Sequence, residues 1–387
     1  MTIKHMIQNS SQLVSQFLGK VINLNLHAKQ IASITDAVTG IVMSSSLRLS
    51  VAGAGMAEAK GTLPKHPIKQ LDRLLSNDKI DTEIIQNNVA ANLIASRPHL
   101  LVAMDWTVFH KDGHMTITLR LITDHGRATP LLSKTVESTD LKGKTRQYEN
   151  ELFDRLRELV PNDKTVIILA DREFGTLNRF EWLRSKYKFD YVIRFKVNTT
   201  ITKSNGESKN AKEWLGSSRS RTFTNAKLAK CGFPIEKVVV CKDKGMKGTW
   251  CLASSCVQVP TKQIKLYYAK RWSTETSYRD EKNIAYGMGM KQSRIKSTAR
   301  RDRLFLLSSL AIMVMTILGA ISEKLGLDRK IRANTCKRRT HSLFTQGKII
   351  FQWLKTNWKS ELGGEIIYEF KQICLDCEDS VSTKARI

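Results

Sequence analysis

Between residues 98 and 196, short apolar runs alternate with segments of helical spacing, and this order leaves few folds open. The apolar runs are 99–109, 114–123, 129–136, 165–170 and 189–195. They are too short for typical helices, and the run 114–123 alternates with period two, so they predict β-strands. Residues 145–160 and 177–187 have the spacing of helices. The sequence therefore predicts an α/β fold with a mixed sheet flanked by helices.

The flanking regions differ in character from this alternating part. Residues 1–95 look helical, with a soft break at Val51–Pro64, which is rich in Gly and Ala. Residues 197–261 contain short β-like runs and predict a β-rich insertion, and Gln263–Ala285 predicts one helix. The predicted organisation is 1–95 helical, 96–196 first part of the core, 197–261 insertion, 262–325 second part of the core and 326–387 C-terminal region.

The charge balance points to a polyanionic partner. The chain has 63 Lys and Arg against 36 Asp and Glu, a formal net charge of +27. Apolar residues make up 41% of the chain, which excludes wholesale disorder. A surface with this excess of positive charge attracts nucleic acid, the commonest cellular polyanion.

The run Leu304–Ile321 leaves a membrane protein open as an alternative. It has no charged residue, and its length is near the lower limit for a membrane span. The central helix of a large α/β core has the same composition. Because no second such run occurs and the N-terminus lacks a secretory signal, we expect a cytoplasmic protein without a membrane partner.

Two aspartates follow apolar runs of the strand type. Asp105 ends the run LLVAM, and Asp171 ends the run VIILA. A single Asp in such a place is more simply explained as the cap of a turn. Two of them, on strands that can be neighbours, are about as well explained by a site at the carboxyl ends of the strands.

A third carboxylate lies in the predicted helix 263–285. Tyr268, Arg271, Glu275 and Lys282 have offsets that place all four on one helix face, within about 40° of arc. Taken alone, this pattern is better explained by an exposed face with local ion pairs. Together, two Asp and one Glu supply the hard oxygen ligands that suit Mg²⁺ or Mn²⁺, and a pair of such ions can cleave a phosphodiester.

At these residues the sequence resembles the IS4 family of bacterial insertion-sequence transposases, to which the Tn5 transposase belongs. The four residues from Tyr268 to Lys282 match the signature Y-x2-R-x3-E-x6-K of that family, and Arg271-Trp272 matches its usual RW pair. Asp171-Arg172-Glu173 matches its DRE at the second Asp. The resemblance covers roughly residues 65–350.

The resemblance implies an RNase H-like core, interrupted by a β insertion, with Asp105, Asp171 and Glu275 as catalytic residues that bind two Mg²⁺, for which Mn²⁺ may substitute. It implies hydrolysis and strand transfer at transposon ends. The residues expected to contact DNA are Tyr268, Arg271, Lys282 and Arg172, with Trp250 as a stacking platform for a flipped base or, equally well, a sheet-core side chain.

Further expectations concern partners. The basic stretch Lys337-Arg338-Arg339 predicts a contact with the DNA backbone, although a solvated face is the alternative. By the resemblance we expect a homodimer on paired transposon ends in the bacterial cytoplasm, bound to double-stranded DNA. The N-terminal helices would help recognise the terminal repeat, and the C-terminal region would help dimerisation. An RNase H-like nuclease and a catalytically inactive DNA-binding inhibitor of transposition remain alternatives.

Overall fold

The computed structural model describes residues 3–22 and 26–375. Residues 1–2, 23–25 and 376–387 lie outside the described residues, and with them parts of the predicted regions 1–95 and 326–387.

A mixed sheet forms the centre of the region that follows the N-terminal helices. In the described chain it has ten strands in the order β3-β2-β1-β4-β5-β10-β9-β8-β6-β7. The strands are β1 (His99–Phe109), β2 (His114–Ile122), β3 (Ala128–Glu137), β4 (Thr165–Ala170), β5 (Asp190–Arg194), β6 (Thr200–Thr202), β7 (Ser208–Asn210), β8 (Ser220–Leu228), β9 (Phe233–Cys241) and β10 (Trp250–Ser254). Strands β1, β4 and β5 are parallel, and β2 and β3 add an antiparallel edge. This confirms the predicted fold class, an RNase H-like mixed sheet flanked by helices.

Helices surround this sheet and build a second, all-helical region. The helices before the sheet are α1 (Ile3–Val21), α2 (Ala28–Ser44), α3 (Leu49–Lys60), α4 (Lys65–Leu75) and α5 (Thr82–Ala95). Within the sheet region they are α6 (Thr145–Leu159), α7 (Leu177–Ser185), α8 (Thr261–Lys270) and α9 (Ser273–Lys282). After it come α10 (Thr298–Lys324), α11 (Asp328–Ile331), α12 (Leu343–Asn357) and α13 (Glu361–Leu375).

The two faces of the sheet have different partners. Strand side chains alternate in direction, so every second residue belongs to the same face. On β1, Val102 and Met104 join the core that includes α6 and α7, whereas Ala103 joins the core that includes α8. Residues of odd number on β1 therefore face α8 and α9. The same alternation puts Ile167 and Leu169 of β4 on that face.

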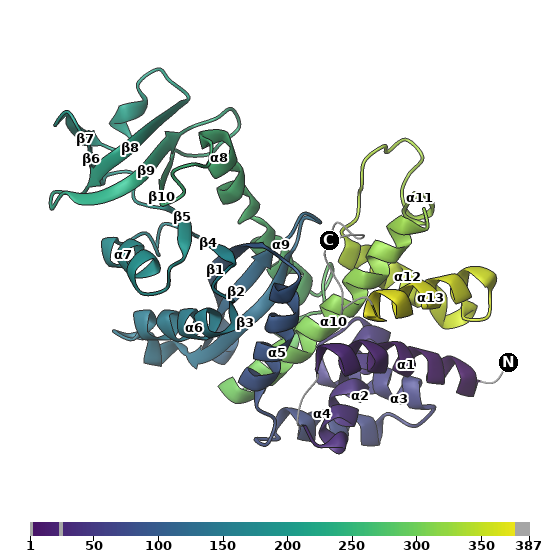
Figure 1. Cartoon of the computed structure of the whole chain (residues 1–387). Helices are drawn as coiled ribbons and strands as arrows, with labels where there is room; N and C mark the ends of the chain where they lie inside the picture. The colour runs from purple at the N-terminus through teal and green to yellow at the C-terminus, as the bar shows by residue number, and fades with distance from the viewer. Residues whose placement is uncertain (1–2, 23–25, 376–387) are drawn as a thin grey trace.

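Helix α10 connects the two regions. In Figure 1 it runs from the foot of the sheet into the helical part, where α1–α4 and α12–α13 gather around it. Its side chains from Leu304 to Ile321 form the middle of the largest apolar core. By length and composition α10 is apolar enough to cross a membrane, but 78% of its most apolar window is buried inside the protein. The bent pair α2 and α3 passes the same test only if it is counted as one span. Burial of α10 among other helices favours the core-helix interpretation.

Two predictions about the helical regions are wrong. The soft break predicted at Val51–Pro64 falls mostly within α3, which continues to Lys60. The Gly and Ala residues there serve close packing, because a Cβ on Gly55 would lie 2.3 Å from the carbonyl oxygen of Gly40 on α2. The single helix predicted over Gln263–Ala285 is two helices, α8 and α9, separated at Arg271 and Trp272.

The predicted insertion, residues 197–261, does contain short strands, and they continue the core sheet. Strand β10 pairs with β5, β9 pairs with β10, and β8 pairs with β9. The sheet therefore extends without interruption from the core into the upper projection of Figure 1. Whether the five predicted segments are separate folding units remains a prediction.

Candidate active site

Asp105 and Asp171 lie beside each other on the face of the sheet that α8 and α9 cover. Strands β1 and β4 pair in parallel up to Ala103 and Leu169. Two residues further along each chain, this register puts Asp105 level with Asp171. Asp105 was expected at the end of its strand, but β1 continues to Phe109 because β2 pairs with it to that point. Only the pairing with β4 ends before Asp105.

The turn after β4 fixes the backbone of Asp171. Its Oδ1 accepts a hydrogen bond from the Glu173 N–H at 2.9 Å, and its carbonyl accepts one from the Phe174 N–H at 3.1 Å. Gly175 then passes so close to β5 that a Cβ would lie 2.2 Å from the carbonyl oxygen of Arg194. The segment DREFG is therefore a tight turn held against the neighbouring strand.

The electrostatic setting of Asp105 is unfavourable for its charge. Burial raises the pKa of Asp105 to about 6, Arg271 acts in the opposite direction, and the neighbouring Asp171 raises the pKa further. In the described part of the chain, no Lys or Arg forms an ion pair with either aspartate. A divalent ion would stabilise two carboxylates that lie this close together.

Glu275 lies in the first turn of α9, and Arg271 holds its side chain. The Arg271 Nη2 donates to Glu275 Oε1 at 3.1 Å. Burial works against the charge of Arg271, but Tyr268, Asp105, Asp171 and Glu275 outweigh it and keep the pKa of the guanidinium above its usual value. Arg271 is thus the cation placed among all three carboxylates. Its Nε is buried without a hydrogen-bond partner.

The three carboxylates do not yet form a closed ligand set. Within residues 3–22 and 26–375, no three His, Cys, Asp or Glu side chains are grouped closely enough to hold a metal ion. The charge of Asp171 acts on Asp105, whereas Glu275 is turned toward Arg271 and its side chain is 39% exposed. To join the two aspartates in a ligand set, the Glu275 side chain would have to leave Arg271.

Tyr268 and Trp250 pack against each other on the same face of the sheet. Their ring centroids lie 4.8 Å apart in an edge-to-face arrangement. Tyr268 is 4% exposed, whereas Trp250 is partly exposed at the start of β10. The predicted DNA contact of Tyr268 is therefore covered by protein in this structure, and Trp250 is a partly exposed side chain of the sheet.

Lys282 points toward β1 rather than outward. Its Nζ donates to the Oγ1 of Thr107, two residues beyond Asp105 on the same face. It also lies over the rings of Phe109 and Tyr278. Burial lowers the pKa of Lys282 to about 8. The ammonium group is therefore held near Asp105 and loses its charge at a lower pH than an exposed lysine.

A buried network that the sequence did not predict attaches α9 to the sheet. Arg120 on β2 donates to both carboxylate oxygens of Glu281, at 3.0 and 2.8 Å. Its guanidinium lies over the ring of Tyr278, whose hydroxyl is 2.6 Å from Thr118 Oγ1. The hydroxyl also donates to the Asp105 carbonyl at 3.3 Å. This network fixes α9, and with it Glu275, above β1 and β2.

Arg194 was also missed, although it lies next to the site. The register of β4 and β5 ends at Ala170 and Ile193, so the next residues, Asp171 and Arg194, are level with each other. The Arg194 Nε is buried without a partner. The sequence does carry a signal for Arg194, because it is a basic residue at the end of the apolar part of a neighbouring strand.

The remaining predicted DNA contacts lie at the surface. Arg172 is exposed and pairs with Glu173 at 3.3 Å. Lys337 and Arg338 are exposed in the loop between α11 and α12. Arg339 is anchored, because it donates to Glu323 and to the carbonyl of His125. The structure does not bring these three loop residues into contact with the carboxylates.

The comparison with known families bears on this arrangement. Residues 98–313 match the family model of the Transposase DDE domain, which is more than half of the chain. The match begins at β1, ends within α10 and includes Asp105, Asp171 and Glu275. A comparison with curated proteins gives no match. The extent of the family match, together with the mixed sheet, shows that the chain belongs to the DDE-domain transposases.

Proposed function

We propose that this transposase is of the IS4 type and uses divalent metal ions to cut DNA at transposon ends and to join the ends to a target. The observation that carries the proposal is the meeting of Asp105 and Asp171 on one face of the sheet, with Glu275 on the helix that covers that face. The spacing from Tyr268 to Lys282 supports the subfamily.

Asp105, Asp171 and Glu275 are the residues that would hold two Mg²⁺, with Mn²⁺ as a substitute. The donor set fits, since all three are carboxylates and the neighbouring Asp171 adds to the rise in the pKa of Asp105. When bound, such ions supply charge stabilisation for a phosphodiester and a more acidic water. The metal requirement separates this proposal from a merely DNA-binding protein.

The side chains around the carboxylates suit a nucleic-acid backbone. The Nε of Arg271 and the Nε of Arg194 are buried donors without partners, and both lie beside the aspartates. A phosphate group offers several acceptor oxygens and would satisfy such donors with charge-assisted hydrogen bonds. Lys282 adds a third cation close to Asp105. In this proposal Tyr268 positions Arg271 and Trp250 rather than touching DNA through its whole ring.

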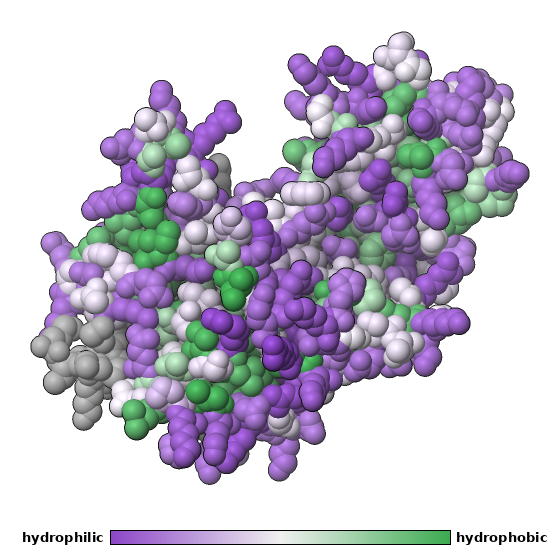
Figure 2. All heavy atoms as spheres, turned by 180° about the vertical axis from the view of Figure 1, so that it is seen from behind, coloured by the Kyte–Doolittle hydropathy of each residue, from purple (hydrophilic) through white to green (hydrophobic). Residues whose placement is uncertain are grey.

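The shape and polarity of the surface bear on where DNA would bind. Figure 2 shows a hollow between two projections, and the surface on both sides of it is largely hydrophilic. In Figure 1, α8 and α9 lie between the projection made by β6–β10 and the loop that follows α11. Lys337 and Arg338 belong to that loop. We propose that double-stranded DNA binds between the projection made by β6–β10 and the loop that follows α11. In this proposal two chains act as a dimer on paired transposon ends. The N-terminal helices contribute to recognition of those ends.

The test is cleavage of a DNA fragment that carries the terminal repeats of the element. Wild type and Glu275→Gln are compared in Mg²⁺, in Mn²⁺ and with EDTA, and Glu158→Gln on the exposed side of α6 is the matched control. We expect cuts at the repeat boundary by wild type and the control, and activity of Glu275→Gln no higher than with EDTA.

Two results would contradict the proposal. Tight binding to the repeats without metal-dependent cleavage by wild type would favour an inactive inhibitor, for which the turn of Glu275 toward Arg271 is the supporting observation. Metal-dependent cleavage without preference for the repeats would favour an RNase H-like nuclease.

A further inference from the structure

The segment between α11 and α12 projects from the protein as a basic loop. Figure 1 shows it standing out beyond the end of α10, across from the projection made by β6–β10. Residues 333–340 are exposed, and Lys337 and Arg338 are among them. Arg329 and Lys330 of α11 precede the loop and are exposed as well. Four exposed cations therefore lie in the loop or directly before it.

These four cations have no partner inside the protein. Within the part of the chain that the structure describes, their side chains form no ion pair and no hydrogen bond. The acidic residues beside them in the chain are occupied by other arginines, because Asp328 pairs with Arg332 at 3.5 Å and Glu323 pairs with Arg339 at 2.5 Å. Unpaired surface cations favour a polyanion, and the phosphates of a DNA duplex supply closely spaced negative charges.

Arg339 differs from these cations because the protein itself binds its guanidinium. The Nε and Nη2 of Arg339 contact the two carboxylate oxygens of Glu323 at 2.5 and 2.6 Å, which is a two-point ion pair. Its Nη1 donates to the carbonyl of His125 at 3.2 Å. Glu323 is held in turn by the side-chain amide of Gln346 on α12, at 2.9 Å. Arg339 therefore fixes the C-terminal side of the loop.

A second arginine holds the N-terminal side of the loop. The Nη1 of Arg332 donates to the carbonyl of Lys337 at 3.2 Å. The ion pair with Asp328 keeps Arg332 beside α11. Lys337 and Arg338 thus lie between two anchored arginines, and their backbone is held from both sides.

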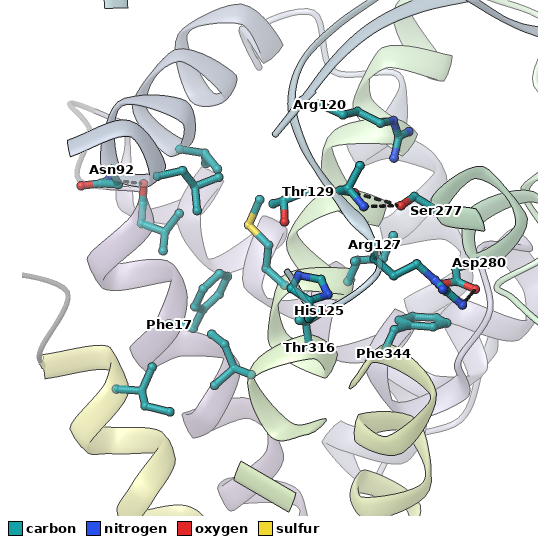
Figure 3. Close-up of a pocket in the computed structure, with 18 of the residues that line it drawn as sticks. Phe17, Asn92, Arg120, His125, Arg127, Thr129, Ser277, Asp280, Thr316 and Phe344 are labelled. Atoms are coloured by element: carbon teal, nitrogen blue, oxygen red, sulfur yellow. Dashed lines mark hydrogen bonds and ion pairs between the residues drawn. The ribbon is translucent and has the colours of Figure 1, made fainter. Parts of the chain in front are cut away.

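The carbonyl that Arg339 binds belongs to the turn between β2 and β3, and this turn also contacts α9. Figure 3 shows Arg127 of the turn directed at Asp280 of α9, with His125 beside it. The Nε of Arg127 donates to Oδ2 of Asp280 at 2.5 Å. One short turn therefore supports the basic loop on one side and, on the other, the helix that carries Glu275.

We propose that this loop is a preformed contact for the phosphate backbone of double-stranded DNA, and that Glu323 and Arg339 position the loop rather than touch DNA. The proposal rests on DNA as the partner in the proposed function, but it does not depend on cleavage. Because the loop is held before DNA binds, binding does not have to order it, and the affinity is higher than for a free loop. Phosphate contacts carry no sequence information, so the loop contributes equally on any duplex.

The sign of the effect of Glu323→Ala separates two explanations. If Arg339 contacts DNA itself, removal of an acidic residue from this surface strengthens DNA binding. If Glu323 positions the loop, its removal frees Arg339, the loop is no longer held, and binding weakens. Glu369→Ala is the matched control, because it removes the same charge from a pair with the neighbouring Lys324 that does not involve the loop.

Affinity is measured on the full-length chain in EDTA over a range of salt concentrations, with a duplex that carries the terminal repeats and an unrelated duplex of equal length. We expect Glu323→Ala to weaken binding at least about threefold on both duplexes, and Glu369→Ala not to weaken it. The double substitution Lys337→Ala and Arg338→Ala should lower the slope of log K against log salt concentration by about two. In that background Glu323→Ala should cause no further loss, because the cations that it positions are gone.

Trypsin cleavage of the wild type gives a second measurement that needs no variant to fold. Lys337 and Arg338 are exposed cleavage sites in the loop. We expect DNA to protect both sites and to leave Lys188 unprotected, since Lys188 is exposed in the loop between α7 and β5, beside the other face of the sheet. Without DNA, Glu323→Ala should be cut in the loop faster than wild type.

Three outcomes overturn the proposal. Binding of Glu323→Ala as tight as that of wild type, or tighter, would mean that Arg339 contacts DNA directly. An equal loss in the background without the two loop cations would mean that the loss does not act through the loop. Equal trypsin cleavage of the loop with and without DNA would place the duplex elsewhere. All three leave metal-dependent end cleavage standing, whereas the absence of cleavage together with loop-dependent binding would overturn the proposed function alone.

Discussion

Replacement of Asp105 by Asn should stabilise the protein while abolishing its proposed activity. Asp105 has an ordinary pKa of 3.8 that burial raises to about 6 in the folded protein, with Asp171 adding to the rise and Arg271 opposing it. A raised pKa in the folded state means that ionisation costs more there than in the unfolded chain. The carboxylate therefore destabilises the fold above pH 6, and this penalty fades as pH falls from 6 toward 3.8.

The magnitude follows from the shift. About two pKa units correspond to about 3 kcal/mol, which is an upper limit. Asn also loses the attraction of Asp105 to Arg271, so we expect the free energy of unfolding to rise by about 1–3 kcal/mol at pH 8 without divalent metal. The gain should shrink steadily between pH 6 and pH 4, where the wild-type carboxyl is protonated in the folded state.

Chemical unfolding in EDTA at several pH values measures this directly. Asp163→Asn is the control, because this exposed Asp precedes β4 and should change stability by no more than about 0.5 kcal/mol. Added Mg²⁺ should raise the stability of wild type more than that of Asp105→Asn, since it binds the folded pair of aspartates. A loss of stability in Asp105→Asn at pH 8, or a gain that does not change with pH, would refute the electrostatic reasoning.

Three further changes test how the site is held together. Glu281→Gln should lower the free energy of unfolding by about 3–5 kcal/mol, because it leaves the guanidinium of Arg120 buried without its counter-charge, and denaturant titration measures the loss. Gly175→Ala should cost about 1–3 kcal/mol in the same assay, because its Cβ would collide with the backbone of Arg194. Lys282→Gln should impair end cleavage below pH 8, and a pH profile should show the difference from wild type narrowing above pH 8 as Lys282 loses its charge.

Matched controls separate these effects from general damage. Glu58→Gln removes a carboxylate from an exposed pair with Lys355 and should cost no more than about 1 kcal/mol. Gly248→Ala adds a Cβ where no atom lies within 4 Å and should be close to neutral. If Glu281→Gln is no worse than Glu58→Gln, the buried network does not hold α9. If the ratio of cleavage by Lys282→Gln to cleavage by wild type stays constant across pH 8, the charge of Lys282 has no part in the reaction.

The sheet could be predicted from the sequence because its strands carry a local signal. The apolar runs after Pro98 and around Ile168 and Val192 correspond to β1, β4 and β5 within a few residues. The chain order of helices and strands then limited the possible architectures. Asp105 and Asp171 were found in the same way, because a charged residue directly after an apolar strand run is unusual. Glu275 was found through its spacing from Tyr268, Arg271 and Lys282.

Other features could not be predicted, because they depend on contacts between distant segments. The pairing of Arg120 with Glu281 joins residues 161 positions apart, and neither residue belongs to a local pattern. The break predicted at Val51–Pro64 failed because Gly is a poor helix former in isolation, whereas here it allows α3 to approach Gly40. The roles of Asp105, Asp171 and Glu275 in catalysis remain predictions that the proposed cleavage assay tests.

The division between α8 and α9 explains how the signature residues reach the site. No Pro or Gly marks it; instead Arg271, Trp272 and Glu275 donate their N–H groups to carbonyls three residues back, which tightens the helix at this point. Helix α8 packs on the sheet through Ile264 and Tyr268, beside β4 and β5, whereas α9 packs on β1, β2 and β3.

Because neighbouring strands in a sheet are twisted relative to one another, one straight helix could not follow both sets of strands. The tightened turn lets each half follow its own strands, and it leaves Arg271 over the junction of β1 and β4, where the two aspartates lie. Trp272, the next residue, is turned outward and is 62% exposed. The regular spacing of the signature is therefore not the spacing of one helix face. Instead, the signature spacing fixes the number of residues between positions on α8 and positions on α9. These two helices pack on different strands, and both approach Asp105 and Asp171.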